Sequence, residues 1–350
     1  MRTSRQQGFT LVELMVAVTI SLLLLAGLST LFVSNNHAQM EIERGNRQVE
    51  NGRYAMQLLT GDLRNAGYYG EFDASALTMP AAAPDPCDTD ISVISGAIAL
   101  HVQGYDGANP LDCLADVRDG TDIVVVRHTA TCAVGDADCD TAAAGGPFLQ
   151  ASACDNTFEL GSGNVANYFQ VSAIDTDLAL HKRDCDATAG SGTAAPIRRL
   201  LTHIYFVANN SDGSDGVPTL KRAEVISKNG TVSVDIVPLA DGIENLQVEY
   251  GLDTDNNGVA DVYTTVPASA NGCGAAACGV TNWNSVVAVK VHLLARTPTE
   301  SAGYQDTKSY TLGLTAAGQA HTLQATNDKY KRHVFSALVG LPNPAGRKTS

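Results

Sequence analysis

The chain of 350 residues is long enough to bury one large core or two ordinary ones, so we expect it to fold without a partner. Its formal net charge of −14 argues against a nucleic-acid ligand, because Lys and Arg carry most phosphate binding. A hydrophobic content of 44%, a charged content of 17% and 32 glycines suit a globular β-rich protein with many turns and argue against a disordered chain.

The first predicted element is an apolar segment near the N-terminus. Residues 9–33 contain a single charge, Glu13, and as a helix they would cross a hydrocarbon core of about 30 Å at about 1.5 Å per residue. Arg2 and Arg5 precede this segment, and no Lys or Arg follows it until Arg44. The positive-inside rule therefore predicts a cytoplasmic N-terminus and an exported remainder.

A processing signal precedes this segment. An ordinary secretory signal is cut after its apolar core, whereas here the clear cleavage pattern, Gly8-Phe9, lies before the apolar core. The basic leader, the Gly8-Phe9 junction, Glu13 and the apolar run together resemble the class III signal of type IV pilins and type II secretion pseudopilins. The resemblance implies that a membrane prepilin peptidase removes residues 1–8 as a leader and methylates the new amine of Phe9.

Glu13 would lie at bilayer depth, where a lone carboxylate is costly and needs a cation. The new amine of Phe9 is the nearest cation, but within one helix it lies about 6 Å away along the axis. We therefore expect the amine of a neighbouring subunit to pair with Glu13 during assembly, as the resemblance also implies. The alternative is an uncleaved signal anchor whose Glu13 reaches the lipid headgroups.

Residues 34–66 continue the helix in amphipathic form. Their apolar side chains recur at spacings of three, four or seven: Val49, Met56, Leu59, Leu63 and Ala66. We expect a single helix from residue 9 to about residue 65, with its second half packed on the globular head. Gly45, Gly52 and Gly61 each weaken it by up to about 1 kcal/mol, and the run AGYYG at 66–70 indicates its end.

Beyond the helix, short β-branched runs alternate with turn residues, which favours antiparallel sheet and an α+β fold of the type IV pilin kind. The predicted strands are 91–102, 121–128, 167–174, 199–208, 219–226, 231–237, 244–252, 284–296, 306–314 and 332–341. Asn229-Gly230 predicts a type I′ hairpin turn. The head divides into a first β region at 67–128, a Cys-, Ala-, Gly- and Asp-rich insertion or linker at 129–156, and a second β region at 157–350.

All eight cysteines lie on the exported side of the apolar segment, where an oxidising compartment favours disulfides. Eight cysteines allow roughly a hundred connectivities, so only local pairs can be predicted. Two tight loops come first and two longer spacings follow: Cys273 with Cys278, Cys132 with Cys139, Cys87 with Cys113, and Cys154 with Cys185. Zinc is the alternative, but the C-x-x-C spacing typical of a zinc site is absent.

The run DTDNNGVAD, residues 253–261, places oxygen ligands at the spacing of an EF-hand-like calcium loop. The predicted Ca²⁺ ligands are the side chains of Asp253, Asp255, Asn257 and Asp261 and the backbone carbonyl of Val259. The last loop position holds Thr264 instead of a bidentate Glu, so the site would be incomplete or finished by other ligands. The alternative is a hairpin whose Asp and Asn side chains cap their own turn. A second acidic turn, 209–216, is typical of a solvated loop.

Enzyme motifs are absent, including G-x-S-x-G, the P-loop and H-E-x-x-H. His101 and His292 lie in apolar strand patterns, which favours packed or edge residues over ligands or bases. Trp283, the single Trp, is typical of a core or subdomain anchor. We therefore predict no catalytic residues and no catalytic cofactor.

Beyond the N-terminal signal, four stretches carry a closer resemblance: 62–70 (DLRNAGYYG), 242–263, 286–297 and 330–343 (YKRHVFSALVGLPN). With them the chain resembles the PilW-type minor pilins of type IV pili. The resemblance implies a low-abundance subunit of a priming or tip complex that starts pilus assembly and supports adhesion and twitching motility. The implied partners are other minor pilins, the major pilin, the prepilin peptidase, the inner-membrane assembly platform and a PilY-type tip adhesin.

The same resemblance implies a single-pass inner-membrane protein with a periplasmic head, and a place in the pilus at the cell surface after assembly. One alternative is a type II secretion pseudopilin of the GspJ-like tip kind, although those heads are usually smaller. Another is a membrane-anchored, calcium-dependent adhesin or uptake receptor. An enzyme is disfavoured because no nucleophile and base are visible together.

Overall fold

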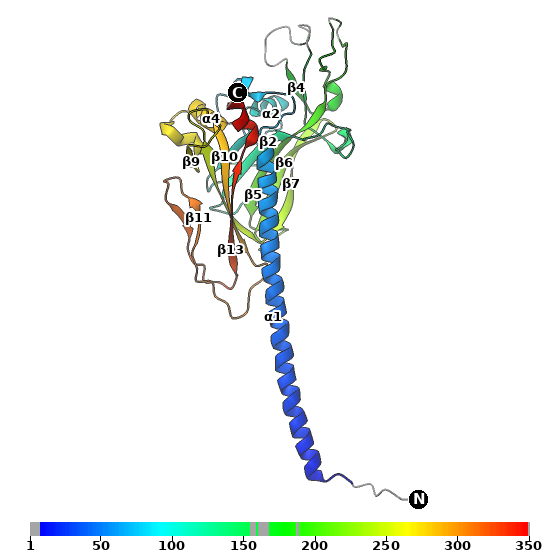
Figure 1. The fold of residues 1–350 in the computed structure, drawn as a ribbon, viewed down its shortest axis with the longest axis vertical. Coiled ribbons are helices and arrows are strands. Elements are labelled where there is room, and N and C mark those ends of the chain that lie inside the picture. The colour runs from blue at the N-terminus through cyan, green and yellow to red at the C-terminus, as the bar shows by residue number, and fades with distance from the viewer. Residues whose placement is uncertain (1–7, 155–158, 160–167, 187, 189, 349–350) are drawn as a thin grey trace, which may run out of the picture. The chain divides into compact units, whose positions relative to one another are not determined.

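The computed structural model describes residues 8–154, 159, 168–186, 188 and 190–348. The chain divides into two units, Met1–Arg47 and Gln48–Ser350. Helix α1 (Leu11–Asn65) begins in the first unit and ends in the second, and the strands belong to the second (Figure 1). The α+β class expected from the sequence is therefore confirmed, with one long N-terminal helix and antiparallel sheets.

The first unit contains the apolar half of α1. Among the described residues, α1 is the one helix long and apolar enough to cross a membrane, and none of its most apolar window is buried. Large side chains such as Leu23 and Phe32 are 74% and 67% exposed. This half of the helix thus offers its apolar surface to an environment outside the chain.

In the second unit, one face of α1 is buried against the head. The buried positions of α1 are Gln48, Gly52, Ala55, Leu59 and Leu63. Their spacing of three or four residues keeps them on one helical face. The helix ends at Asn65, and Gly67 follows with a φ of +73°, a conformation that glycine adopts without strain. The stop predicted at AGYYG is therefore confirmed.

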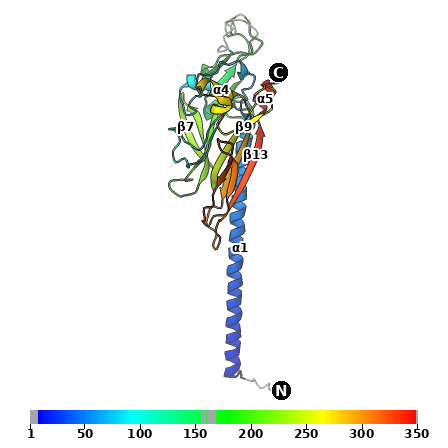
Figure 2. The ribbon, with the colours of Figure 1, turned by 90° about the vertical axis from the view of Figure 1, so that its left-hand side faces the viewer.

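The larger sheet has seven antiparallel strands. Its order is β1-β2-β5-β3-β4, and β6 pairs with both β5 and β7. In Figure 2, β7 of this sheet lies on the opposite side of the head from β13. The strands are β1 (Val102–Tyr105), β2 (Ile123–Thr129), β3 (Phe148–Ala151), β4 (Phe169–Ser172), β5 (Ile197–Ala208), β6 (Thr219–Lys228) and β7 (Thr231–Asp241). Between β6 and β7, Asn229 and Gly230 have φ angles of 52° and 79°, as a type I′ turn requires.

The described residues of the head also form a four-stranded sheet, a two-stranded hairpin and short helices. The four-stranded order is β13-β10-β8-β9, and β11 pairs with β12. The bounds are β8 (Ile243–Leu252), β9 (Val262–Thr264), β10 (Val286–Arg296), β11 (Tyr310–Leu314), β12 (Ala320–Leu323) and β13 (Arg332–Gly340). Besides α1, the α-helices among the described residues are α2 (Ile91–Ala97), α4 (Ala276–Asn284) and α5 (Pro342–Lys348).

The main core brings the second half of α1 together with both larger sheets. Leu59 and Leu63 of α1, Val124 and Val126 of β2 and Val248 of β8 are all fully buried in one cluster. A second cluster gathers α2 with β3, β4 and β5. Because the buried part of α1 belongs to the main core, the head cannot complete its packing without residues 48–63.

The strand predicted at 91–102 is wrong over its first part, which forms α2. Asp90 caps this helix, since its carboxylate accepts a hydrogen bond from the Ser92 backbone N–H. The cap and the helical spacing of Ile94 and Ala97 outweigh the β-branched composition. Sequence reasoning also missed β3, β9, β12, α4 and α5, and all of β1 except Val102. The stretch 129–156, expected as an insertion or linker, contributes β3 to the seven-stranded sheet.

Candidate functional site

The predicted processing signal lies at the start of α1. Thr10 precedes the first helical residue, and its backbone N–H and hydroxyl donate to Glu13 Oε2 at 2.9 and 2.8 Å. The Glu13 N–H donates in return to Thr10 Oγ1 at 3.3 Å. This reciprocal pair is a capping box, which satisfies free N–H groups at the helix start. Glu13 therefore has a local role in addition to the intersubunit role expected for it, and the T-x-x-E pattern could have revealed it.

The junction Gly8-Phe9 lies just before this cap. Phe9 is 89% exposed, and a Cβ on Gly8 would meet no other atom within 4 Å. An exposed junction outside regular secondary structure is the kind of backbone that a protease can bind. The assignment of Gly8 and Phe9 as the cleavage and methylation site remains a prediction.

The acidic loop 253–261 joins β8 to β9. Carboxylate oxygens of Asp253, Asp255 and Asp261 lie within 4.8 Å of one another, and Asp253 is buried. Each carboxylate also caps the loop: Asp253 Oδ2 accepts from the Gly258 N–H at 2.9 Å, and Asp261 Oδ2 accepts from the Thr254 N–H at 2.8 Å. The three predicted carboxylate ligands of Ca²⁺ therefore lie close together. The same side chains also cap the turn, as the alternative interpretation expects.

The remaining predicted ligands lie in the same loop. The Asn257 side chain accepts from the Val259 N–H at 2.7 Å and donates to Asp255 Oδ2 at 3.0 Å. Thr264 is the last residue of β9, where it pairs with Tyr250 of β8. The Lys348 ammonium lies 4.0 Å from Asp253 Oδ2, so a cation in the loop would compete with this positive charge. The Ca²⁺ site remains a prediction.

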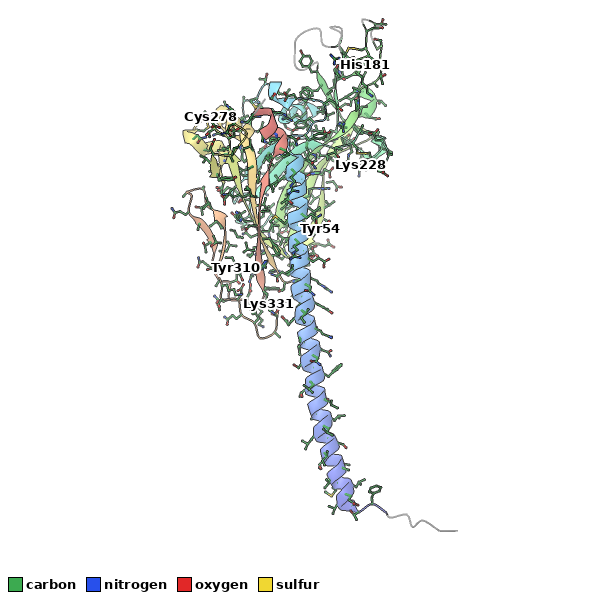
Figure 3. All side chains as sticks on the ribbon, viewed as in Figure 1. Tyr54, His181, Lys228, Cys278, Tyr310 and Lys331 are labelled. Carbon is green, nitrogen blue, oxygen red and sulfur yellow. A yellow bond between two sulfur atoms is a disulfide. The ribbon has the colours of Figure 1, made fainter. Side chains whose placement is uncertain are left out.

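Four disulfides join the pairs that the spacings favoured: Cys87–Cys113, Cys132–Cys139, Cys154–Cys185 and Cys273–Cys278. Each closes a loop of the head, and Cys278 lies in α4 (Figure 3). Such bridges stabilise a fold chiefly by restricting its unfolded chain. They fit the exported location that the sequence predicts for the head.

The histidines and the tryptophan considered above as possible ligands, bases or binding platforms all make contacts within the head. His101 is buried, and its Nε2 lies 2.7 Å from the Val286 carbonyl. Burial lowers the pKa of His101 to about 4, although the bond to Val286 opposes this shift. Trp283 is buried edge-on against Tyr250, with ring centroids 4.8 Å apart. His292 on β10 lies 2.8 Å from the Ser336 hydroxyl.

A cluster that sequence reasoning missed lies where α1 meets the seven-stranded sheet. The Asp62 carboxylate of α1 contacts His128 Nε2 of β2 at 2.7 Å and His203 Nδ1 of β5 at 2.9 Å. The Tyr205 hydroxyl donates to Asp62 Oδ2 at 3.0 Å. In chain order these residues are far apart, and the available signal was a lone His inside each of two apolar strands.

The charges in this cluster support one another. Burial alone would raise the pKa of Asp62, but the charge of His203 and hydrogen bonds from both imidazoles hold it well below its usual range. Burial opposes the charged form of His203, yet Asp62 and Glu224 raise its pKa. We call Asp62, His128 and His203 the histidine cluster.

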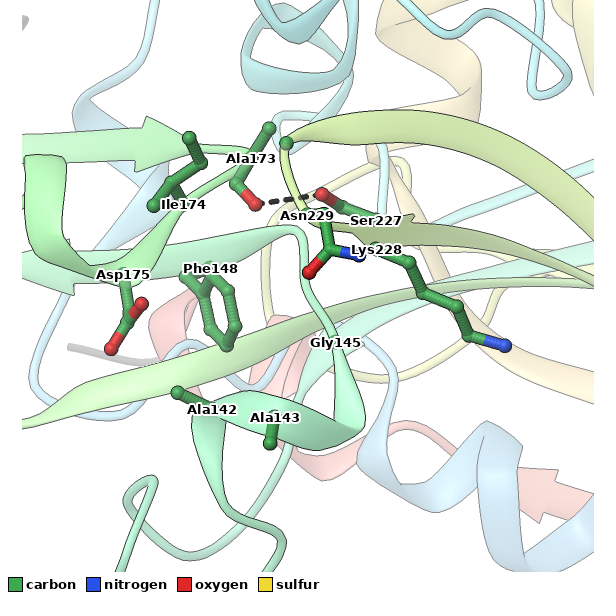
Figure 4. Close-up of a pocket in the computed structure, with 11 residues that line it drawn as sticks. Ala142, Ala143, Gly145, Phe148, Ala173, Ile174, Asp175, Ser227, Lys228 and Asn229 are labelled. Carbon is green, nitrogen blue, oxygen red and sulfur yellow. Dashed lines mark hydrogen bonds between the residues drawn. The ribbon is translucent and has the colours of Figure 1, made fainter.

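A surface pocket lies beside the β6–β7 hairpin. Phe148, Ile174 and Asp175 line it together with the hairpin residues Lys228 and Asn229 (Figure 4). The Ser227 hydroxyl donates a hydrogen bond to the Ala173 carbonyl at 2.7 Å. Its proton is therefore engaged in a structural contact. Among the residues described around this pocket, no nucleophile lies beside a base, so the pocket carries no argument for catalysis.

Comparisons with known proteins match two separate parts of the chain to family models. Residues 204–343 match the family of type IV pilus-assembly protein W, and residues 3–29 match the prokaryotic N-terminal methylation motif. Among solved structures, a type IV-like pilin from Thermus thermophilus matches with 14% identity and a TM-score of 0.35, over 85% of this chain and 98% of that chain. No curated protein matches the chain.

Proposed function

Taking the chain as a PilW-type minor pilin, which its two family matches support, we propose that it joins a priming or tip complex that starts type IV pilus assembly. The observation that carries the proposal is the combination of a pilus-assembly domain with an N-terminal methylation motif on an exposed apolar helix. In this role the protein supports adhesion and twitching motility. Its partners are other minor pilins, the major pilin and a PilY-type tip adhesin.

The proposed mechanism is associative. Prepilin peptidase cuts after Gly8 and methylates Phe9, and the apolar half of α1 holds the subunit in the inner membrane with its head in the periplasm. The assembly platform then draws the subunit into a bundle of pilin helices, where Glu13 pairs with the amine of a neighbour. A buried ion pair of this kind is favourable because each charge would otherwise lie unpaired in an apolar environment.

The size of the head supports a tip position over a repeating shaft. Residues 48–350 form one unit with two larger sheets and their own core. A subunit whose head is this large has more surface to bind a partner or a substrate than a shaft requires. We therefore place the protein at the tip or in the complex that initiates the fibre.

A deletion strain tests the assembly role. We expect it to lose surface pili in electron micrographs and to regain them when the full gene is restored. Normal pili with loss of surface attachment would favour the calcium-dependent adhesin instead. Normal pili with loss of protein secretion would favour the type II secretion pseudopilin.

We also propose that the loop 253–261 binds Ca²⁺ through Asp253, Asp255, Asn257, Val259 and Asp261. Oxygen-only ligands suit a hard cation, and the three carboxylates already lie together. Adding Ca²⁺ to chelated protein should raise the melting temperature of the head, because a ligand that binds the folded state stabilises it. The Asp255→Asn variant should lose that response, and an equal response in this variant would exclude the site.

A further inference from the structure

The histidine cluster presents three ligand atoms from three different elements to one point. Asp62 lies on α1, His128 on β2 and His203 on β5, and one ligand atom from each lies within 4.8 Å of the others. Their side chains are 11%, 5% and 7% exposed. On the paired strands, His203 lies opposite Val126, which places His128 diagonally beside it. One helix and two paired strands thus fix the positions of the three ligand atoms.

The hydrogen bonds of these imidazoles reveal an excess of acceptors. His128 Nδ1 lies 2.8 Å from the Thr129 carbonyl, while its Nε2 lies 2.7 Å from the Asp62 carboxylate. Both partners only accept hydrogen bonds, and a neutral imidazole has a single N–H to donate. A neutral His128 ring can therefore donate to only one of these two acceptors, and its other nitrogen turns a lone pair towards the second.

His203 repeats the pattern. Its Nδ1 lies 2.9 Å from Asp62 Oδ2, and its Nε2 lies 3.6 Å from Glu224 Oε2. Asp62 Oδ2 also accepts from the Tyr205 hydroxyl. Each imidazole therefore lies between two acceptors, Thr129 and Asp62 for His128 and Asp62 and Glu224 for His203, in a place largely closed to water.

A single divalent cation between the two imidazoles and Asp62 would satisfy this excess of acceptors. If each imidazole keeps its proton on the nitrogen that faces Thr129 or Glu224, the other nitrogen of each turns a lone pair towards Asp62. A histidine whose second nitrogen donates to a carbonyl or a carboxylate is the usual arrangement of metal-binding histidines.

We propose that Asp62, His128 and His203 form a buried site for a divalent transition metal, with zinc as the ion that best fits two imidazoles and a carboxylate. Imidazole nitrogen disfavours Ca²⁺ and Mg²⁺, which prefer oxygen ligands. Zinc bonds of about 2.0–2.1 Å would require the Asp62–histidine distances to lengthen by roughly 0.5 Å. The Tyr205 hydroxyl or a water molecule completes a tetrahedral set. The metal would fasten the last turns of α1 to the seven-stranded sheet.

The test measures metal in the full chain purified in detergent. The protein is treated with a chelator, dialysed, exposed to Zn²⁺, and freed of unbound ion, and the retained zinc is measured by mass spectrometry. We expect one zinc ion per wild-type chain and a raised melting temperature, with no retention of Mg²⁺. His128→Gln and His203→Gln should lose the zinc, whereas His292→Gln, outside the cluster, should keep it.

Two further measurements keep the result interpretable. Asp253→Asn should keep the zinc, which separates this site from the acidic loop. Cobalt added to wild-type protein should give the intense visible absorption of a tetrahedral nitrogen and oxygen site, and this readout does not depend on the variants folding. Wild-type protein that retains no zinc and shows no such absorption overturns the proposal, as does equal zinc in the two cluster variants and wild type.

Discussion

The two halves of α1 differ in which side chains they bury. In the first half, large apolar side chains such as Leu23 and Phe32 are mostly exposed. In the second half, the buried face includes the small or polar residues Gln48, Gly52 and Ala55. Hydrophobicity alone therefore does not indicate which part of the helix belongs to the head. The exposed half implies an apolar partner outside the chain, whereas the buried half is defined by shape and hydrogen bonds.

The buried half owes its fit to particular contacts. The Gln48 amide donates to the carbonyls of Ala295 and Lys331 at 2.7 and 3.0 Å, which joins the helix to β10 and to the residue before β13. At Gly52, an added Cβ would run into the Phe335 ring of β13, so this ring packs directly on the helix backbone and a larger residue would displace it. These positions explain why the small residues lie on the buried face.

Replacing one leucine in each half gives the largest expected contrast. Leu59→Ala should destabilise the head by about 2–5 kcal/mol, because Leu59 is fully buried in the main core. Leu23→Ala should leave the free energy of unfolding of the head within about 0.5 kcal/mol of wild type. Denaturant unfolding in detergent measures both. If both variants lost the same free energy of unfolding, the two halves of the helix would contribute equally to the stability of the head, contrary to this comparison.

Acid should lower the stability of the head through His101. Because the pKa of His101 falls from 6.5 to about 4 on folding, the unfolded chain binds more protons between these values. Stability therefore falls as the pH drops from 6.5 towards 4, by about 3 kcal/mol in total. His101→Gln keeps a donor for the Val286 carbonyl but does not titrate.

Unfolding at pH 7 and pH 4 gives the comparison between wild type and His101→Gln. The acid-induced loss of stability should be smaller in the variant by up to the full contribution of His101. Identical losses in the two proteins would mean that His101 is protonated at no cost in the folded state, contrary to its burial.

Two glycines on α1 separate packing from helix propensity. Gly52→Ala should cost about 1–3 kcal/mol, because the new methyl group meets the Phe335 ring. Gly61→Ala, which meets no atom within 4 Å, should stabilise the helix by up to about 1 kcal/mol. Melting temperatures should therefore move in opposite directions. If Gly52→Ala raised the melting temperature, the Phe335 ring could not lie against the helix at position 52.

Local patterns predicted the elements whose cause is local. The apolar run predicted α1, Asn229-Gly230 predicted the hairpin, and short spacings favoured the four disulfides. The β-branched run at 91–97 misled because Asp90 caps it as a helix. The histidine cluster was beyond prediction, since 66 residues separate Asp62 from His128 and the register of β2 on β5 brings the histidines together. The capping role of Glu13 was visible in the sequence but was overlooked.

The charge of Glu13 is the most direct test of the proposed assembly role. Gln can fill the same place in a capping box, so Glu13→Gln keeps the helix start and removes the charge. Thr10→Val is the matched control, because it removes the hydroxyl that contacts Glu13 and keeps the charge. Mass spectrometry of both variants should show a leader cut after Gly8. We predict that Glu13→Gln reduces the number of surface pili to that of the deletion strain, whereas Thr10→Val retains most of them. A Glu13→Gln protein that is cut correctly and still supports a wild-type number of pili would contradict the account.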